Sequence, residues 1–319
     1  MQKLRSYTLL FWKACGTINR NQHCGDRKVK QLFGEFTDRQ EMIRPDFEYF
    51  HSVNREPVQV PYHSHDFYEV LLFFSGNVDY VVEGRVYHPQ QGDVLLTNNR
   101  ELHRPQVREG QTYERIVLWL QPGYVRSLGG SENLALCFEA SSRQHSNLLR
   151  PQEEIRRKLQ NLCGELEQVY ISDAYGSAAL RRAYCMQLLV WLNRAYFSAS
   201  PEKQYVDSDS KVDEIVRYIN EHLKEELSLD VLSARFYLSK YHLTRQFKKY
   251  MGFSVHQYVV RKRLIAARLA LQSGSTPGEA FAQSGFADYT NFSRAFRAQY
   301  GISPRSVHEE KLTTGRKNS

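Results

Sequence analysis

The sequence predicts a multidomain α+β protein, with a β-rich domain first, a helical segment next and an all-α domain last. Three observations carry this prediction. Short apolar or alternating stretches recur between residues 58 and 120, which is typical of β-strands. Apolar residues then recur at steps of three and four between residues 155 and 196, which is typical of amphipathic helices. Finally, one pattern occurs twice between residues 235 and 305, offset by forty-nine residues, which indicates a duplicated structural unit.

The length of 319 residues leaves room for more than one domain. No apolar run approaches the length of a membrane span, so no membrane partner is expected. The five cysteines are odd in number and irregular in spacing, which favours neither a disulfide framework nor a zinc framework. These features predict a cytoplasmic protein. Residues 1–41 are polar and basic without sustained periodicity, and we expect an extension that is disordered or precedes the true start of the chain.

The first domain is expected over residues 42–145. Stretches of apolar or alternating residues follow one another there, separated by turn residues, and such a series predicts a small β-barrel or sandwich. The expected strands are Tyr68–Phe74, Val78–Glu83, Arg85–Tyr87, Val94–Thr97 and Arg115–Leu120, with turns at Glu83-Gly84 and at 89–93.

Two helices are expected over residues 146–200, each with an apolar face that can pack against the β-rich domain. A polar stretch that begins at Ser198 then predicts a linker over 201–210. The last domain follows at 211–308, with a tail at 309–319. The apolar positions are Ile155, Leu159, Leu162, Leu166 and Val169 in the first helix, and Leu180, Tyr184, Leu188, Trp191 and Leu192 in the second.

Each copy of the repeat predicts two short helices joined by a tight turn. A Ser, Thr or Asp stands where each helix needs an N-cap, and a Gly stands where each second helix should end. The caps are Ser228 and Ser239 in the first copy and Thr276 and Asp288 in the second, and the glycines are Gly252 and Gly301.

The second helix of each copy has one apolar face and one basic, polar face. Leu243 and Phe247 lie one turn apart and should face inward, as should Phe292 and Phe296. Residues 235–305 contain twelve Lys or Arg against two acids, a net charge of +10, whereas the rest of the chain sums to −2. A duplicated, basic unit of two helices and a turn predicts a helix-turn-helix domain that neutralises DNA phosphates.

Residues 211–308 resemble the AraC/XylS-type transcription regulators, in which a linking helix joins two helix-turn-helix units. Two departures from the family pattern fall at packing or backbone positions and leave the class unchanged: Val255 replaces a common proline, and Val307-His308 replaces Tyr-Arg. The matching residues are Gly252, Ser254, Tyr258, Arg263, Leu264 and Ala267, followed by Ala280, Gly285-Phe286, Tyr289, Phe292-Ser293-Arg294, Phe296-Arg297, Gly301 and Ser303-Pro304.

This resemblance places a linking helix at about 255–271 and the DNA contacts on the second helix of each unit. Arg can bind guanine through two hydrogen bonds, whereas Asn, Thr and Ser suit adenine edges, thymine methyls or phosphates. Arg245 and Arg294 occupy equivalent positions and should read two major-groove segments, although either could contact only a phosphate. The expected DNA-binding residues are Lys240, Tyr241, His242, Thr244, Arg245 and Lys248, then Tyr289, Thr290, Asn291, Ser293, Arg294 and Arg297.

The β-rich domain resembles the cupin-type sensor domains of many regulators in this family. A His-x-His-x-x-x-Glu motif followed by Gly76 fits the first cupin signature, and Pro89-x-x-Gly92-Asp93 resembles the second more loosely. Three imidazoles and a carboxylate can bind a divalent transition metal. The other interpretation is that these side chains line a ligand pocket or organise the mouth of the barrel. The candidate metal ligands are His63, His65, Glu69 and His103.

In regulators of this kind the cupin usually binds a small molecule and does no chemistry, so neither a catalytic residue nor a resident cofactor is expected. A sugar-like effector would need polar groups and aromatic surfaces around it. The candidate effector-binding residues are Tyr62, His63, His65, Glu69, Tyr80, Tyr87 and His103.

The resemblance therefore implies a transcription regulator, commonly an activator, that is controlled by a small-molecule effector. Its expected partners are double-stranded DNA, RNA polymerase, the effector and a second copy of the chain. The helices at 146–200 either mediate dimerisation, as they often do in the family, or only pack on the β-rich domain. The alternative from another class is a metal-dependent cupin enzyme fused to a DNA-binding domain.

Overall fold

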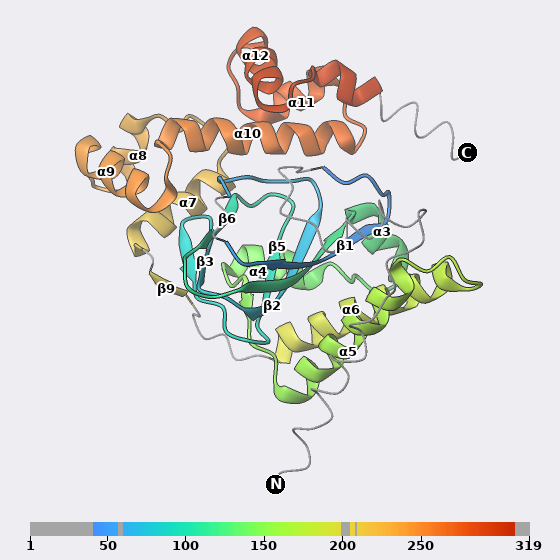
Figure 1. Cartoon of the computed structure of the whole chain (residues 1–319). Helices are drawn as coiled ribbons and strands as arrows, with labels where there is room; N and C mark the ends of the chain where they lie inside the picture. The colour runs from blue at the N-terminus through green and yellow to red at the C-terminus, as the bar shows by residue number, and fades with distance from the viewer. Residues whose placement is uncertain (1–40, 57–59, 199–204, 208, 310–319) are drawn as a thin grey trace.

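The computed structural model of the chain describes residues 41–56, 60–198, 205–207 and 209–309. The expected extension at 1–41 and the tail at 309–319 lie almost entirely outside these residues, as does part of the expected linker. The β domain occupies the middle of the molecule, with two long helices on one side and the C-terminal helices on another (Figure 1). Within the described residues, no helix combines the length and the apolar composition needed to cross a membrane.

The strands of the β domain form two antiparallel sheets in the described part of the chain. The first has the order β1-β7-β2-β5-β8 and the second the order β6-β3-β4-β9. The predicted cupin-like β domain is confirmed, but as two facing sheets rather than one closed barrel. The strands are β1 (Phe47–Asn54), β2 (Tyr68–Ser75), β3 (Val78–Val82), β4 (Arg85–Tyr87), β5 (Val94–Thr97), β6 (His103–Val107), β7 (Tyr113–Leu120), β8 (Leu148–Leu149) and β9 (Tyr205–Asp207).

Strand β2 is apolar on both faces because it separates two cores. Val70 and Leu72 face a core that is shared with helices, whereas Leu71 and Phe73 face the core between the two sheets. Side chains alternate between the faces of a strand, so neighbouring residues of β2 enter different cores. A strand buried on both faces needs a continuous apolar run, which is what the sequence has there.

Four helices cover the outer face of the first sheet. Leu159 and Leu166 of one long helix and Leu188 and Leu192 of the other are buried in the same core as Val70 of β2. These helices therefore pack on the β domain, in agreement with one interpretation of their apolar faces. The helices are α3 (Pro122–Leu128), α4 (Leu136–Gln144), α5 (Glu153–Tyr170) and α6 (Ser177–Ser198).

Four strands were not predicted, and all four are edge strands of their sheets. β1 pairs with β7 in the first sheet. β6 is largely polar and contains Pro105, which its position at the edge of the second sheet tolerates. β8 pairs with β5 and lies beyond the expected domain boundary at residue 145. β9 lies in the expected linker and pairs with β4. Short edge strands lack the alternation that identifies a strand in sequence, and only their pairing partners define them.

The C-terminal domain contains two helix-turn-helix units joined by the long helix α10 (Val255–Gln272), as predicted. All four predicted N-cap side chains accept hydrogen bonds from backbone N–H groups at their helix starts. Gly252 and Gly301 end the second helices in the left-handed conformation. The four apolar side chains expected to face inward are fully buried. The other helices are α7 (Ser210–Glu221), α8 (Leu229–Arg235), α9 (Lys240–Met251), α11 (Pro277–Ser284) and α12 (Tyr289–Tyr300).

The tip of the β3–β4 hairpin connects the two domains. Its two-residue turn, Glu83-Gly84, has positive φ angles of 48° and 82° and belongs to the type favoured between twisted strands. A Cβ atom on Gly84 would lie 2.4 Å from the Sδ atom of Met251, so the tip fits closely against α9. A glycine is therefore needed at this position both for the turn and for the contact between domains.

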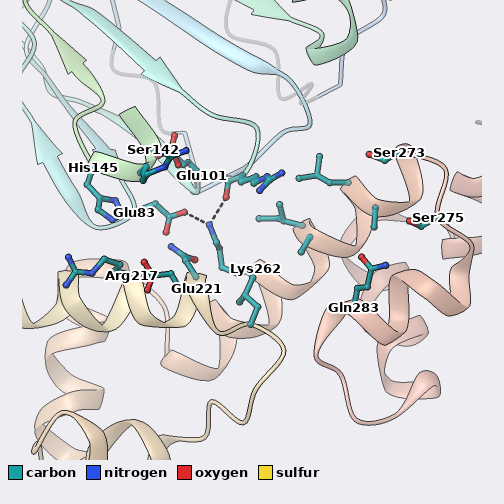
Figure 2. Close-up of a pocket in the computed structure, with 18 residues that line it drawn as sticks. Glu83, Glu101, Ser142, His145, Arg217, Glu221, Lys262, Ser273, Ser275 and Gln283 are labelled. Carbon is teal, nitrogen blue, oxygen red and sulfur yellow. Dashed lines mark hydrogen bonds and ion pairs between the residues drawn. The ribbon is translucent and has the colours of Figure 1, made fainter. Parts of the chain in front are cut away.

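Two buried charges on this hairpin are paired with charges of the C-terminal domain. The Glu83 carboxylate lies 2.9 Å from the Lys262 Nζ atom of α10 (Figure 2). It also accepts a hydrogen bond from the Tyr258 hydroxyl. Arg85 forms an ion pair of 3.0 Å with Asp213 of α7. Burial by itself would raise the pKa of Glu83, but the Lys262 charge and the hydrogen bonds outweigh burial and lower it.

We predict that Lys262→Met lowers the free energy of unfolding by about 3–5 kcal/mol, because it leaves the buried Glu83 carboxylate without its cation. Denaturant unfolding at neutral pH, followed by circular dichroism, measures the loss. The double variant Glu83→Gln/Lys262→Met is the control, since it removes both charges and should recover most of the stability. Wild-type stability in the single variant would contradict the proposed importance of this pair.

Candidate functional site

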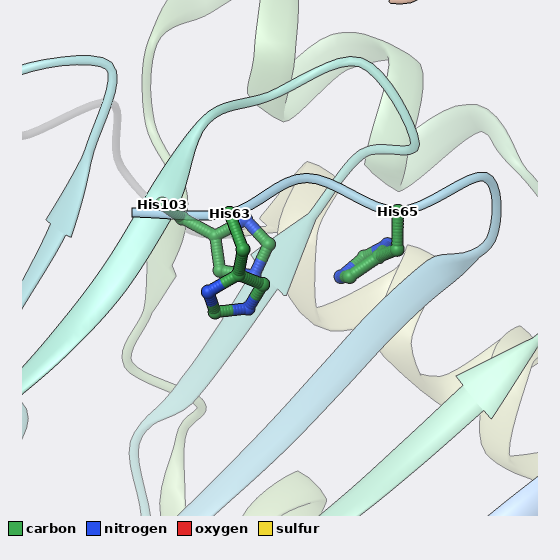
Figure 3. Close-up of side chains that lie close together, drawn as sticks. All are labelled: His63, His65 and His103. Atoms are coloured by element: carbon green, nitrogen blue, oxygen red, sulfur yellow. The ribbon is translucent and has the colours of Figure 1, made fainter. Parts of the chain in front are cut away.

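Three histidines that are distant in sequence come together near one end of the β domain. His63 and His103 are joined by a pair of backbone hydrogen bonds of 3.1 and 3.0 Å, and His65 follows two residues later. One nitrogen atom from each ring lies within 4.8 Å of the others. The three rings project toward one another (Figure 3). His65 and His103 are buried, whereas His63 is half-buried.

Backbone carbonyls determine which nitrogen of each ring is available. The Nδ1 atoms of His63, His65 and His103 lie 3.0, 2.8 and 3.1 Å from carbonyl oxygens, which can only accept, so each Nδ1 carries the proton. The Nε2 atoms are therefore the ones with a lone pair. Those of His65 and His103 are buried and have no hydrogen-bond partner. Burial lowers the pKa of both rings well below the ordinary value, which keeps them uncharged.

A carboxylate completes the group. One carboxylate oxygen of Glu69 lies 3.7 Å from the Nε2 atom of His65, and the other lies 3.8 Å from the Nε2 atom of His103. The same oxygens accept hydrogen bonds from the Tyr80 hydroxyl at 2.8 Å and from the Trp119 indole at 2.9 Å. Glu69 is thereby held in place beside the imidazoles although it is buried.

The donor set fits a divalent transition metal such as zinc. Neutral imidazoles whose Nδ1–H groups are held by carbonyls present Nε2 in the tautomer that metals bind. Two buried nitrogen atoms without partners are also rare in a folded protein unless a ligand, water or ion satisfies them. His63, His65 and His103 would hold the ion, with Glu69 as a further ligand or as the acceptor that orients them.

The structure brings five of the seven candidate effector-binding residues together and separates the other two. Tyr62 lies at the domain boundary, where its ring stacks with the Arg104 guanidinium at 4.3 Å and faces Phe253. Tyr87 is fully buried within the second sheet, and its hydroxyl lies 3.1 Å from the His145 carbonyl. Tyr62 nevertheless lines a pocket together with His63, at the edge of the histidine cluster. The five residues together are His63, His65, Glu69, Tyr80 and His103.

Sequence reasoning missed Trp119, which holds Glu69. The two residues are directly opposite each other on the paired strands β7 and β2. An apolar residue in a strand gives no sign of such a role, because the register between strands is not visible in a single sequence. Only the hydrogen bond from its indole identifies it.

The second helices of the two units present their polar faces to solvent. Of the twelve side chains expected to contact DNA, eleven are exposed and Ser293 is half-buried. Within the described residues Lys240 pairs with Asp230, whereas Arg245 and Arg294 form no ion pair. Helix α9 lies beside one end of α10, whereas α12 lies above its middle in the view of Figure 1. Their basic side chains are therefore available to an anionic partner at two separate positions.

Comparisons with known proteins agree with both parts of the chain. The family model for an AraC-like ligand binding domain matches residues 45–189, and the model for a helix-turn-helix domain matches residues 232–310. The HTH-type transcriptional activator RhaS of Salmonella schwarzengrund is 28% identical over 250 residues, which cover 78% of this chain and 87% of that protein. RhaS of Escherichia fergusonii is 29% identical with the same coverage.

Solved structures are similar to part of the chain. The DNA-binding domain of AdpA, determined in complex with a target DNA, is 27% identical, covers 34% of this chain and 96% of its own, and has a TM-score of 0.32.

Proposed function

Because the chain belongs to the AraC-type family of transcription regulators, we propose that it binds specific promoter DNA through α9 and α12 and activates transcription in response to a small-molecule effector. The observation that carries this proposal is the pair of equivalent arginines, Arg245 and Arg294, which are exposed on two recognition helices and have no acidic partner among the residues that the structure describes. RNA polymerase is the partner through which an activator acts. The site of action is the cytoplasm, where the DNA is.

Two different recognition helices on one chain favour an asymmetric DNA site. His242 and Asn291 occupy equivalent positions in the two units but offer different hydrogen-bonding groups. Lys240 and Tyr289 differ in the same way. Shared residues maintain the two-helix unit, and these differing residues distinguish the two DNA segments that are read.

We predict that Arg245→Ala and Arg294→Ala each weaken specific DNA binding by about 1–3 kcal/mol, because each removes two hydrogen bonds to a base. Fluorescence anisotropy with a fragment selected from a random library by the wild-type protein measures the affinity. Arg157→Ala is the control, since Arg157 is an exposed arginine of α5. Wild-type affinity in both variants would show that α9 and α12 are not the recognition helices.

The same variants separate base reading from phosphate contact. A lost base contact lowers affinity for the selected fragment more than for random DNA, whereas a lost phosphate contact weakens both and reduces the dependence on salt.

Dimerisation through α6 is supported by the composition of that helix. Its buried face includes Leu188 and Leu192, yet Met186 and Phe197 on another face are 39% and 58% exposed. A helix that is apolar on opposite sides is stable in water only when both sides are covered. A second copy of the chain is the partner that would cover this face.

We predict that Met186→Glu raises the dimer dissociation constant at least about tenfold, because it places an unpaired charge in an apolar interface. Light scattering across a dilution series measures the mass of the particle. Asn161→Glu on the exposed face of α5 adds the same charge elsewhere and should leave the dimer intact. A wild-type protein that stays monomeric at micromolar concentration would contradict the proposal.

The histidine cluster supports a second proposal, that the β domain binds a divalent transition metal. The unpartnered Nε2 atoms of His65 and His103 favour it. A resident metal is compatible with a sensor and also with a metal-dependent enzyme fused to a DNA-binding domain. A metal-dependent activity that His63→Ala abolishes would favour the enzyme. An intact effector response without metal would favour the sensor.

We predict that one Co²⁺ ion binds per chain with an absorption spectrum typical of imidazole ligands, and that saturation raises stability by about 2–4 kcal/mol. His65→Ala should abolish both effects because it removes one of the three ligands. His256→Ala, at an exposed position on α10, is the control. Equal Co²⁺ binding by wild type and His65→Ala would exclude a metal at this cluster.

A further inference from the structure

A cavity of about 600 Å³ lies between the β domain and the C-terminal domain. Its walls come from both domains, with the β domain on one side and helices α7, α10 and α11 on the other (Figure 2). This volume lies in the range of small-molecule sites. The cavity is separate from the histidine cluster, because none of the three histidines lines it.

The polar wall of the cavity carries arginines that lack acidic partners. Arg100 and Arg143 come from the β domain and Arg217 from α7. All three are exposed, and within the described residues none of their guanidinium groups has a hydrogen bond or an ion pair. Two domains therefore contribute unpaired cations to one space. Like charges that approach each other in this way are stabilised by an anion between them.

The acidic residues of the cavity offset this positive charge only in part. Glu83 is already paired with Lys262, so that pair is neutral. Burial raises the pKa of Glu101 to about 7, which leaves that carboxyl only partly charged near neutral pH. Glu221 on α7 remains as an exposed acid. One full negative charge thus faces the three unpaired arginines.

Helix α10 contributes an apolar patch to the cavity, next to the polar side chains of Ser273, Ser275 and Gln283. Ile265 and Leu269 lie one turn apart on α10 and line the cavity together with the small side chains Ala266 and Ala270. This patch favours the apolar part of an organic molecule. The polar wall and this patch together suit a molecule with an anionic group and an apolar body.

We infer that this interdomain cavity is a regulatory site for a small organic anion, whose carboxylate, phosphate or sulfonate group binds Arg143 and Arg217. The inference rests on the proposed function and locates a site of effector control between the domains. An anion there contacts Arg143 of the β domain and Arg217 of the DNA-binding domain at once. It also contacts α10, which packs against α9, α11 and α12. Binding of the anion and binding of DNA must then influence each other equally.

The experiment uses the full chain and anilinonaphthalene sulfonate, an anion with an apolar ring system that fluoresces when bound. N-phenyl-naphthylamine has the same rings without the sulfonate and reports the apolar part of binding alone. Arg143→Ala and Arg217→Ala should each weaken binding of the anionic probe about tenfold, because each removes a charge-assisted hydrogen bond. Binding of the neutral probe should change less than about twofold, because no charge is involved.

Arg126→Ala is the matched control, since Arg126 is an exposed arginine of α3 outside the cavity. If either alanine variant fails to fold, Arg143→Gln and Arg217→Gln replace it. Saturating anionic probe should also change the affinity for the selected DNA fragment, and Arg217→Ala should remove that change. Failure of the wild-type protein to bind the anionic probe, or equal binding by all variants, would overturn the inference.

Specific DNA binding is measured separately, so the two proposals fail in distinguishable ways. Intact DNA binding without an arginine-dependent probe site would refute the interdomain site and leave the regulator function standing. Loss of sequence-specific DNA binding in the wild-type protein would refute the regulator function whatever the probe does.

Discussion

The buried ion pair between Glu83 and Lys262 constrains the arrangement of the two domains. A carboxylate in this position cannot remain charged without its cation, and the cation comes from the other domain. The Lys262 ammonium also donates a hydrogen bond of 2.6 Å to the Arg100 carbonyl. Separation of the domains would therefore leave a buried carboxylate and a buried lysine without partners until water replaced them.

This constraint connects the histidine cluster to the DNA-binding domain through a short segment of chain. The Leu102 amide donates to the Glu83 carboxylate, and the Leu102 side chain is buried in the core of the C-terminal domain. The next residue, His103, belongs to the histidine cluster. In these three consecutive residues, Glu101 lines the interdomain cavity, Leu102 enters the core of the C-terminal domain, and His103 is a candidate metal ligand. The interdomain cavity and the histidine cluster therefore border the same segment.

The two halves of the chain differ in how far a single sequence predicts them. The N-caps of α9 and α12, the glycines that end these helices and their pairs of inward-facing apolar side chains depend on near neighbours in sequence. All of them were predicted correctly. The β domain was predicted as a class, but β1, β6, β8 and β9 were missed because their pairing partners are not visible in a single sequence. The histidine motif was visible, whereas the support of Glu69 by Trp119 was not.

Local residue patterns therefore decide the duplicated helical units, their basic outer faces and the identity of the imidazoles, since each of these depends on near neighbours along the chain. Tertiary structure alone decides that His103 meets His63 and His65 and that Glu69 lies beside them, because these residues come from separate segments of the chain. It also decides that Glu83 and Lys262, 179 residues apart, share one buried site and that three arginines border one cavity. Charges so far apart in sequence become partners only when two domains pack together and exclude water between them.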